Sequence, residues 1–489
     1  MAAQKNKPWR QAEILVKTMS GSKLFCLFLA MSLLCSCVRF HPRPVSAPQT
    51  LSAFEARTLD SPELKKYFLA MGLALVWPLP SWDIDSLTLA GFFYHPDLDV
   101  ARAQWGVAQA GRKSAGEMPN PTASVALGYN RTTPVAEVTP WIPEAALEIP
   151  VETAGKRGYR ISQARHLAEA ARLHVLAVAW DVRSRLRGAF LDLFAARESE
   201  SLLRAQQAIE EESVRILAAQ LAVGEASTYE VTQARIAFDQ SRLGALQAAE
   251  QSAKARVQLA GAMGLPPKAL DGLVFRFDDF LDPRVDIPAS EIRRRALLNR
   301  ADILAGLAEY QASQSALQIE IAKQYPDINI GPGYQLDQTD IKWTLGLNLL
   351  LSLFNRNRGP IAEAEARRSE AAARFQVLQA EVIGKVETAV AACRSAADRV
   401  GTAAAMLAEL KKQEATSREQ YQLGEISKLE LLGVQLELAT SRLSRLDALV
   451  KAQLAIADLE AAMQAPLDWE KRILASPART PGQVQEQKK

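Results

Sequence analysis
The side chains able to do chemistry are few, and their spacing matches no common catalytic or metal-binding pattern. The four histidines are His41, His95, His166 and His174, and the four cysteines are too scattered for a metal cluster or a disulfide framework. The basic run GKRGYR at 155–160 lacks the upstream glycine and the Ser/Thr of a phosphate-binding loop. We therefore expect no enzyme, no cofactor and no metal, and we interpret 155–160 as a basic anchor at a membrane surface.

Two serine–glutamate pairs have the spacing of helix caps. Ser227 and Glu230 recur 200 positions later as Ser427 and Glu430, and a glycine precedes each pair. In such a capping box the serine accepts a hydrogen bond from the N3 amide, and the glutamate accepts one from the serine amide. Because a glycine commonly ends the preceding helix, each pair predicts a tight hairpin of two helices.

The N-terminal segment is typical of a bacterial lipoprotein signal. Basic residues precede an apolar run that is too short to span a bilayer. The run ends in the lipobox-like sequence 34–37, which predicts a signal peptide over 1–36, with Met19 as a possible start, and lipidation of Cys37. Val38 stands where inner-membrane lipoproteins often carry Asp, which favours the outer membrane. An ordinary secretory signal or an apolar anchor is the alternative.

Most of the remaining chain is an internal duplication. A shift of 200 residues aligns 224–266 with 424–466, whereas a shift of 205 aligns 97–129 with 302–334. We expect the first half to carry five extra residues in one loop. The predicted organisation is a lipidated tether with an equatorial segment (37–90), a first repeat (91–270), a linker with a second equatorial segment (271–295), a second repeat (296–468) and a disordered tail (469–489).

Each repeat is predicted to contain one very long helix and two shorter ones. The Ala-rich stretches 157–222 and 360–422 would each form a helix roughly 100 Å long. The shorter helices, of about 24 and 38 residues, together nearly equal the long one, which suggests that they stack end to end beside it. Heptad spacing of apolar residues predicts a coiled-coil seam in the second repeat, and this spacing stops at Gln453. The seam consists of Leu429, Leu432, Leu436, Ala439, Leu443, Leu446 and Val450.

Four segments alternate between apolar and polar residues, two in each repeat. The apolar positions are Val125, Leu127, Tyr129, Leu147, Ile149, Ile328, Ile330, Tyr334, Trp343, Leu345 and Leu347. Each segment is close to the 9–11 residues of a tilted transmembrane strand, with an apolar face toward lipid and a polar face inward. A soluble, half-buried strand has the same pattern, but four of them in a secreted, lipidated chain favour the membrane.

Four strands cannot close a barrel in a membrane. An open sheet edge in hydrocarbon leaves unsatisfied N–H and C=O groups, each of which costs several kcal/mol. Copies of the chain must therefore pool their strands, and the polar faces would line a wet lumen. The predicted fold class is mainly α with transmembrane β: duplicated halves whose long coiled-coil helices form an α-helical barrel, with four strands from each protomer entering a shared β-barrel.

Residues 55–468 resemble the TolC-like outer-membrane efflux proteins. The resemblance rests on HPDLDVARAQ and NRADILAGLAEYQAS at the repeat starts, YPDINIGPGY before a strand, LFNRNRGPIAEAEARRSEAAARF at a long helix and YQLGEISKLELL at the second glycine. It implies a homotrimer with a twelve-stranded barrel in the outer membrane of a Gram-negative bacterium and a twelve-helix periplasmic tunnel. The implied partners are a periplasmic adaptor, an inner-membrane pump of the resistance–nodulation–division type and outer-membrane lipid. LFNRNRGPIAEAEA is most similar to the cobalt–zinc–cadmium efflux branch.

The resemblance also implies roles for the two hairpin tips. It makes them the adaptor-contact surface, formed by Val223, Gly224, Glu225, Leu423, Gly424 and Glu425. Glu430 matches an acid that lines the closed periplasmic mouth, where three carboxylates would favour cations and resist closing. A second acidic ring is not expected, because the next such position is Gly433. Glu430 therefore has two competing roles, gate acid and helix cap.

The surviving alternative is a protein that conducts nothing. A periplasmic coiled-coil lipoprotein or an adaptor-type scaffold would also contain long helices, but an adaptor would carry one helical hairpin and a lipoyl-like β-domain. The formal net charge of +3 over 489 residues is nearly balanced, so we expect no nucleic-acid partner.

Overall fold
The computed structural model describes residues 40–73, 76–131, 139–283, 289–337, 340–351 and 354–467. The chain separates into two units, 1–56 and 57–489. The first contains the helix α3 (Ala47–Glu55). The predicted signal peptide, Cys37 and the predicted disordered tail 469–489 lie outside the described residues.

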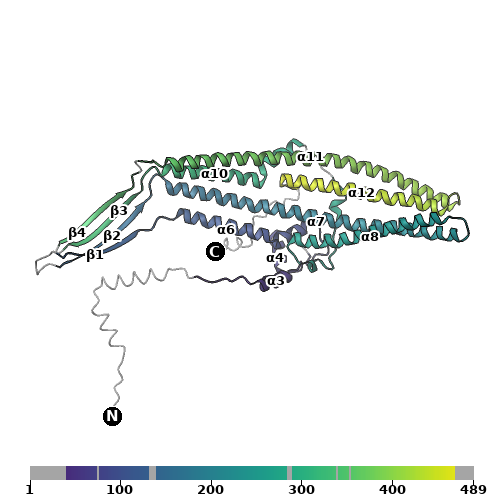
Figure 1. The fold of residues 1–489 in the computed structure, drawn as a ribbon, viewed down its shortest axis with the longest axis horizontal. Coiled ribbons are helices and arrows are strands. Elements are labelled where there is room, and N and C mark those ends of the chain that lie inside the picture. The colour runs from purple at the N-terminus through teal and green to yellow at the C-terminus, as the bar shows by residue number, and fades with distance from the viewer. Residues whose placement is uncertain are drawn as a thin grey trace, which may run out of the picture. The chain divides into compact units, whose positions relative to one another are not determined.

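The second unit contains the duplicated elements that the sequence predicts (Figure 1). The first repeat comprises α6 (Pro96–Gly116), β1 (Thr122–Tyr129), β2 (Trp141–Val151), α7 (Lys156–Ala222) and α8 (Thr228–Met263). The second comprises α10 (Ala301–Ala322), β3 (Ile328–Asp337), β4 (Asp340–Leu349), α11 (Arg358–Gln422) and α12 (Lys428–Met463). Both repeats therefore contain the same elements in the same order.

Short helices precede each repeat. They are α4 (Pro62–Ala70) and α5 (Ile84–Tyr94) before the first, and the 3-10 turns η1 (Pro267–Leu270) and η2 (Asp278–Phe280) with α9 (Ala289–Asn299) before the second. The predicted boundaries at 90/91 and 295/296 fall inside α5 and α9, and the first of the duplicated helices begin at Pro96 and Ala301.

The five extra residues of the first repeat do not lie in one loop, as the sequence comparison suggested. Equivalent positions are separated by 205, 202 and 200 residues in turn, as the pairs Tyr129–Tyr334, Trp141–Trp343 and Gly224–Gly424 show. Three extra residues therefore lie between β1 and β2, and the other two lie in α7, which has 67 residues against 65 in α11. Ala-rich helix sequence gives no signal that would locate a two-residue difference.

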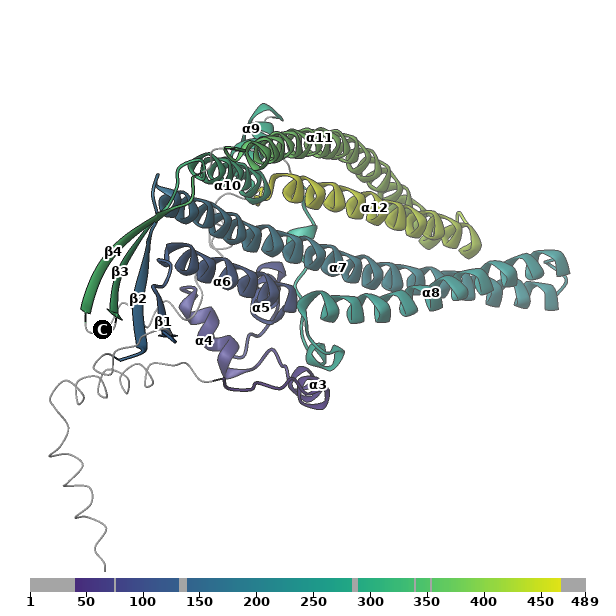
Figure 2. The same cartoon turned by 60° about the vertical axis from the view of Figure 1, so that its left-hand side comes forward.

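The long helix α7 is the central element of the helical layer (Figure 2). It packs along α6 and α8 of its own repeat and along α10 and α12 of the second repeat. In the second repeat α11 packs along α10 and α12 in the same way. Each long helix thus lies beside a pair of shorter ones, as the helix lengths predict.

The shorter helices meet end to end at two contacts, which we call the helix joints. At the first, a Cβ added to Gly264, after the end of α8, would lie 2.8 Å from the Tyr94 carbonyl oxygen, next to the start of α6. At the second, Gln464 accepts a 2.8 Å hydrogen bond through Oε1 from the Ala301 amide at the start of α10. Each joint places a helix C-terminus against a helix N-terminus, where the opposite ends of the two dipoles attract.

The four strands form one antiparallel sheet in the order β1-β2-β3-β4. Its register places apolar residues opposite each other along one face, as in Val125–Ala145, Tyr129–Trp141, Ile149–Ile330, Tyr334–Trp343 and Ile330–Leu347. Polar residues and glycines line most of the other face, so the sheet has the two-sided character that the alternation predicts.

The largest apolar core packs the equatorial segments against α7. Trp82 forms a β-bridge with Phe275, which brings the segment before α5 beside the segment between η1 and η2. Buried side chains of α7, among them Leu186 and Phe190, complete this core. Residues 59–94 and 265–280 therefore contribute to one core with the middle of the long helix.

Candidate functional site
The apolar face of the sheet is the first candidate site. All eleven apolar residues that the sequence predicts for membrane strands lie within β1–β4. Val125 is 83% exposed and Leu345 is 71% exposed in the single chain. Contact of apolar surface with water costs about 25 cal/mol per Å², and soluble monomers rarely expose a continuous patch of this kind. This face therefore requires an apolar environment.

Aromatic pairs mark the end of the sheet remote from the helices. The rings of Tyr129 and Trp141 lie 4.9 Å apart, and those of Tyr334 and Trp343 lie 5.1 Å apart. The two pairs occupy equivalent places in the two hairpins. Tyr and Trp combine an apolar ring with a polar atom, which suits the boundary between hydrocarbon and water.

The opposite face and the edges of the sheet are polar. Lys342 pairs with Asp337 at 2.5 Å, and Glu144 lies opposite Gln335. Each edge strand, β1 and β4, has one neighbour in the sheet, so its outer N–H and C=O groups have no strand partner within the described part of the chain. The sheet is thus apolar on one face, polar on the other and open at both edges.

Lys156, within the basic run 155–160, locks the sheet to the helices. Lys156 is buried, and its Nζ donates to Asp327 Oδ1 and to the Tyr325 carbonyl, both at 2.7 Å. Arg160 of the same run forms an ion pair with Glu152. Acids and carbonyls of the chain itself therefore satisfy both side chains, which the interpretation of this run as a membrane-surface anchor did not predict.

The hairpin tips are the second candidate site. Gly224 and Gly424 have φ of 81° and 75°, the left-handed conformation that favours glycine. The next amide, of Glu225 or Glu425, donates back to the carbonyl five residues earlier, at 2.8 and 2.9 Å. These bonds form the Schellman motif that ends a helix. They leave Val223 and Leu423, the residues before each glycine, strongly exposed.

Both predicted capping boxes are present at the tips. The Ser227 amide donates to Glu230 at 2.7 Å, and the Ser427 amide donates to Glu430 at 2.6 Å. The hydrogen bond from the Ser427 amide is the main cause that lowers the pKa of Glu430, which favours an ionised carboxylate at neutral pH. Glu430 is solvent-exposed while it caps the helix, so its charge reaches solvent.

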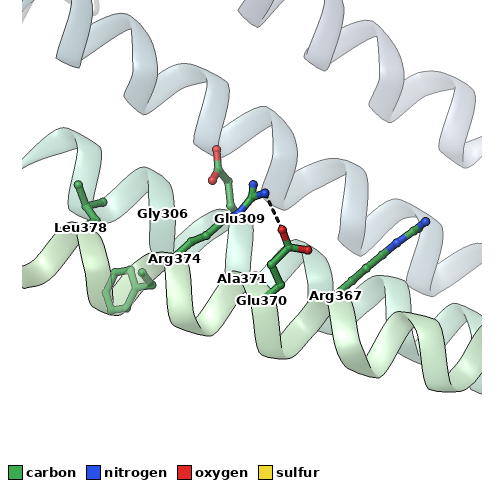
Figure 3. Close-up of a pocket in the computed structure, with 8 residues that line it drawn as sticks. Gly306, Glu309, Arg367, Glu370, Ala371, Arg374 and Leu378 are labelled. Atoms are coloured by element: carbon green, nitrogen blue, oxygen red, sulfur yellow. Dashed lines mark hydrogen bonds and ion pairs between the residues drawn. The ribbon is translucent and has the colours of Figure 1, made fainter.

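The third candidate is a groove of about 320 Å³ between α10 and α11 (Figure 3). Phe375 and Leu378 form its apolar floor beside Gly306. Arg374 on its rim pairs with Glu370 of the same helix at 2.6 Å. Its lining residues include no Ser, Cys or His, and its polar side chains are Glu309, Arg367, Glu370 and Arg374.

A buried polar cluster joins the two repeats, and sequence reasoning missed it. Glu460 of α12 accepts from Arg183 of α7 at 2.7 Å, and Arg187 lies 3.4 Å from the same oxygen. Gln453 accepts from Arg187 at 3.2 Å and donates to the Phe280 carbonyl at 3.0 Å. The only sequence signal was Gln453, where the heptad pattern stops.

Two further features concern metal ligands and membrane-spanning helices. In the described part of the chain, no group of three or more His, Cys, Asp or Glu side chains is arranged to hold a metal ion. Among the helices formed by these same residues, none is both long and apolar enough to cross a membrane.

The chain belongs to the outer membrane efflux protein family, whose profile matches residues 94–265 and 292–464. These two ranges correspond to the two repeats. The predicted family and fold class are thereby confirmed. The cobalt-zinc-cadmium resistance protein CzcC of Cupriavidus metallidurans is 24% identical over 271 residues, which cover 55% of this chain and 62% of CzcC. The match thus spans less than two thirds of that relative.

Other relatives and solved structures are similarly distant in sequence. The pyoverdine export outer membrane protein OpmQ of Pseudomonas aeruginosa is 23% identical over 64% of this chain and 68% of OpmQ. The structure of CusC matches this chain with a TM-score of 0.63, at 18% identity over 88% of this chain and all of CusC. The outer membrane protein VceC of Vibrio cholerae matches with a TM-score of 0.62, at 18% identity over 79% of this chain and 97% of VceC. These structures share the fold.

Proposed function
We propose that the protein is the outer-membrane channel of a tripartite efflux system. The observation that carries this proposal is the sheet, which has one exposed apolar face, one polar face and two open edges. Three copies supply twelve strands, which close a barrel and leave no unpaired edge in hydrocarbon. The polar faces then line a water-filled lumen, and the long helices continue the duct into the periplasm.

The tips are proposed to meet a periplasmic adaptor that links the duct to an inner-membrane pump of the resistance–nodulation–division type. Val223 and Leu423 support this role, because each presents an apolar side chain to solvent at a tip that backbone hydrogen bonds hold rigid. Lipidation of Cys37 would hold the N-terminus at the outer membrane. Labelling with palmitate, lost in Cys37→Ser, tests the anchor separately from the channel.

The proposed substrates are heavy-metal cations, by similarity to CzcC. The similarity to OpmQ makes export of an organic solute the competing outcome. Deletion of the gene should sensitise cells to zinc, cobalt or cadmium, and the wild-type gene should restore growth. Unchanged metal tolerance with impaired export of an organic solute would contradict the proposed substrate class and leave the channel intact.

The decisive test of the channel is the state of the purified protein in detergent. We expect a trimer by native mass spectrometry and ion conductance after insertion into planar bilayers. A monomer without conductance, recovered from the inner-membrane fraction, would favour the non-conducting scaffold. The two tips and paired strands argue against an adaptor, because each repeat contains a full set of these elements.

The role of Glu430 is tested by removing its charge and keeping its cap. Glutamine also completes a capping box, so Glu430→Gln should fold normally. Because each trimer loses three charges, its cation-to-anion permeability ratio should fall, on the order of two-fold. Glu230→Gln makes the same change at the other tip and should leave the reversal potential unchanged. Ser427→Ala weakens the cap by about 1 kcal/mol and keeps the charge. An unchanged reversal potential in Glu430→Gln would leave only the capping role.

A further inference from the structure
We propose that acid weakens the first helix joint more than the second. Each joint is held by the same two kinds of bond, in which an arginine binds the end of one helix and a side-chain acceptor caps the start of the next. Different residues supply these bonds at the two joints, and at the first joint the cap is a histidine. All of these contacts lie within one chain, so the acid response does not depend on the proposed channel function.

An arginine binds the last carbonyls of the incoming helix at each joint. Arg300, which is buried, donates to two carbonyls in the last turn of α12. Arg57 donates to the Gly264 carbonyl, just after α8, at 2.8 Å and to the Tyr94 carbonyl at 3.0 Å. Positive charge is favourable at a helix C-terminus, and an arginine side chain stays charged in proteins. The arginine bonds are therefore insensitive to pH.

The two arginines do not occupy equivalent positions. The shift of 205 residues that relates the starts of the two repeats places His95 opposite Arg300. Arg57 comes from the segment before α4, which precedes the first repeat. The N-terminal segment thus supplies the arginine of the first joint, and position 95 carries a different side chain with a different role.

His95 caps the start of α6. It is buried, and its Nδ1 accepts a hydrogen bond from the Asp97 amide at 3.2 Å. Its backbone belongs to the first joint, because a Cβ added to Gly264 would lie 3.1 Å from the His95 Cα. At the second joint Gln464 accepts from the Ala301 amide instead, and its carboxamide does not titrate. Gly264, which is equivalent to Gln464, has no side chain that could form this bond.

Protonation of His95 removes its bond to the helix. A neutral imidazole nitrogen can accept a hydrogen bond, whereas both nitrogens of the charged ring are donors. The charged ring would also lie at a helix N-terminus, where the helix dipole disfavours positive charge. Acid therefore uncaps α6 at the point where the chain after α8 packs against it.

The charged groups around His95 do not offset this loss. Asp97 Oδ2 lies 3.8 Å from the His95 Nδ1, but the same oxygen already pairs with Arg185 of α7 at 2.6 Å. Arg57 binds the carbonyl of the preceding residue and adds a second positive charge nearby. Asp99 is the other acid of α6 close to His95, and it pairs at 3.1 Å with the arginine three residues later. Arginines therefore engage both acids.

The pKa of His95 gives the sign and the range of the pH dependence. Burial is the main cause that lowers this pKa; the two acids raise it, and Arg185 lowers it. When the start of α6 frays, His95 reaches water and regains an ordinary pKa of about 6.5. The frayed state then binds the proton more readily, so the joint has its full strength above about pH 6.5 and weakens as pH falls below this value.

In the proposed duct the first joint supports one of the two tips. From this joint α6 leads toward the sheet, and α8 lies between the joint and the tip at Gly224. Acid in the periplasm would therefore loosen the support of this tip more than that of the tip at Gly424. This consequence, unlike the contacts themselves, rests on the proposed function.

Hydrogen exchange of the full-length protein in detergent compares the two joints directly. Peptides spanning 96–100 and 301–305 report the first turns of α6 and α10, after correction for the intrinsic effect of pH on exchange. Between about pH 7.5 and about pH 5 the first peptide should lose protection, roughly five-fold, as expected for loss of a helix cap. The second peptide, capped by Gln464, should change little.

His95→Asn is the matched variant. An asparagine side chain also caps a helix but takes up no proton, so residues 96–100 should stay protected at both pH values. Asp181 of α7 is unchanged in this variant, and burial is the main cause that raises its pKa. The variant therefore separates the titration of His95 from that of this nearby carboxyl.

A loss of protection confined to 96–100 in the wild type, and absent from His95→Asn, would support the role of His95. Equal losses at both joints, no loss at 96–100, or a loss that persists in His95→Asn would overturn it. The wild-type comparison needs no substitution, so a failure of the variant to fold would still leave a decisive result. Trimer mass and conductance test the channel separately and do not enter these outcomes.

Discussion
Val125→Arg should prevent assembly of the protein in the outer membrane. Val125 lies in β1 on the apolar face, where the proposed barrel meets lipid. An arginine facing lipid near the bilayer midplane costs about 2–4 kcal/mol, and each trimer would contain three, or roughly 6–12 kcal/mol in total. We expect little trimer in the outer-membrane fraction and no conductance.

Ser124→Arg is the matched control for this change. Ser124 is the adjacent residue on β1, and its side chain points to the opposite, polar face. An arginine there would lie in the wet lumen, so assembly should continue while the conductance changes. Normal yield and conductance of Val125→Arg, or equal loss of both variants, would contradict the assignment of the two faces. Trimer yield is measured on gels of unheated membrane fractions.

Glu460→Ala should produce the largest loss of stability in the helical layer. It would leave the guanidinium groups of Arg183 and Arg187 buried without their carboxylate partner. Removing one partner of a buried ion pair typically costs about 3–5 kcal/mol, and we expect Glu460→Ala to lose about this much free energy of unfolding. The free energy of unfolding, from denaturant titration in detergent, measures the loss, with Glu370→Ala as the control.

Glu370 is a suitable control because its ion pair with Arg374 is exposed. Exposed pairs contribute about 0–1 kcal/mol, so this variant should unfold close to the wild-type midpoint. A loss below about 1 kcal/mol in Glu460→Ala would mean that the buried cluster relaxes or admits water, and would contradict its role as a lock between the repeats.

The same cluster gives stability a defined dependence on pH. Burial alone would raise the pKa of Glu460, but the charges of Arg183 and Arg187 hold this pKa below its usual value. A carboxyl with a lowered folded pKa stabilises the fold above its unfolded pKa, about 4.3, and this contribution is lost as pH falls through the folded pKa. The stability difference between wild type and Glu460→Ala should therefore be full at pH 7 and shrink in acid.

The features with a local pattern were predictable from the sequence. The strand faces follow from alternation, because side chains project to opposite sides of a strand. The tips follow from a glycine and a capping box within seven residues. In each case the residues that decide the structure are neighbours in the chain, so one sequence contains the whole signal.

Features that depend on distant partners were not predictable. Arg183 and Glu460 are 277 positions apart, and Lys156 and Asp327 are 171 apart. The sequence revealed a basic run at 155–160 but nothing that linked it to an acid in the other repeat, so the run was interpreted as a membrane anchor. The two extra residues of α7 were likewise hidden, because its Ala-rich sequence has no apolar pattern strong enough to reveal an insertion.

The helix joints have a mechanical consequence. In each repeat one rod is a single continuous helix, α7 or α11. The rod beside it consists of two helices that meet at their ends, through close backbone contact at Gly264 and through a hydrogen bond at Gln464. Tension applied at the tips therefore travels to the sheet along the two unbroken rods. The divided rods can pivot where their pieces meet, near Gly264 and Gln464, without any peptide bond being stretched.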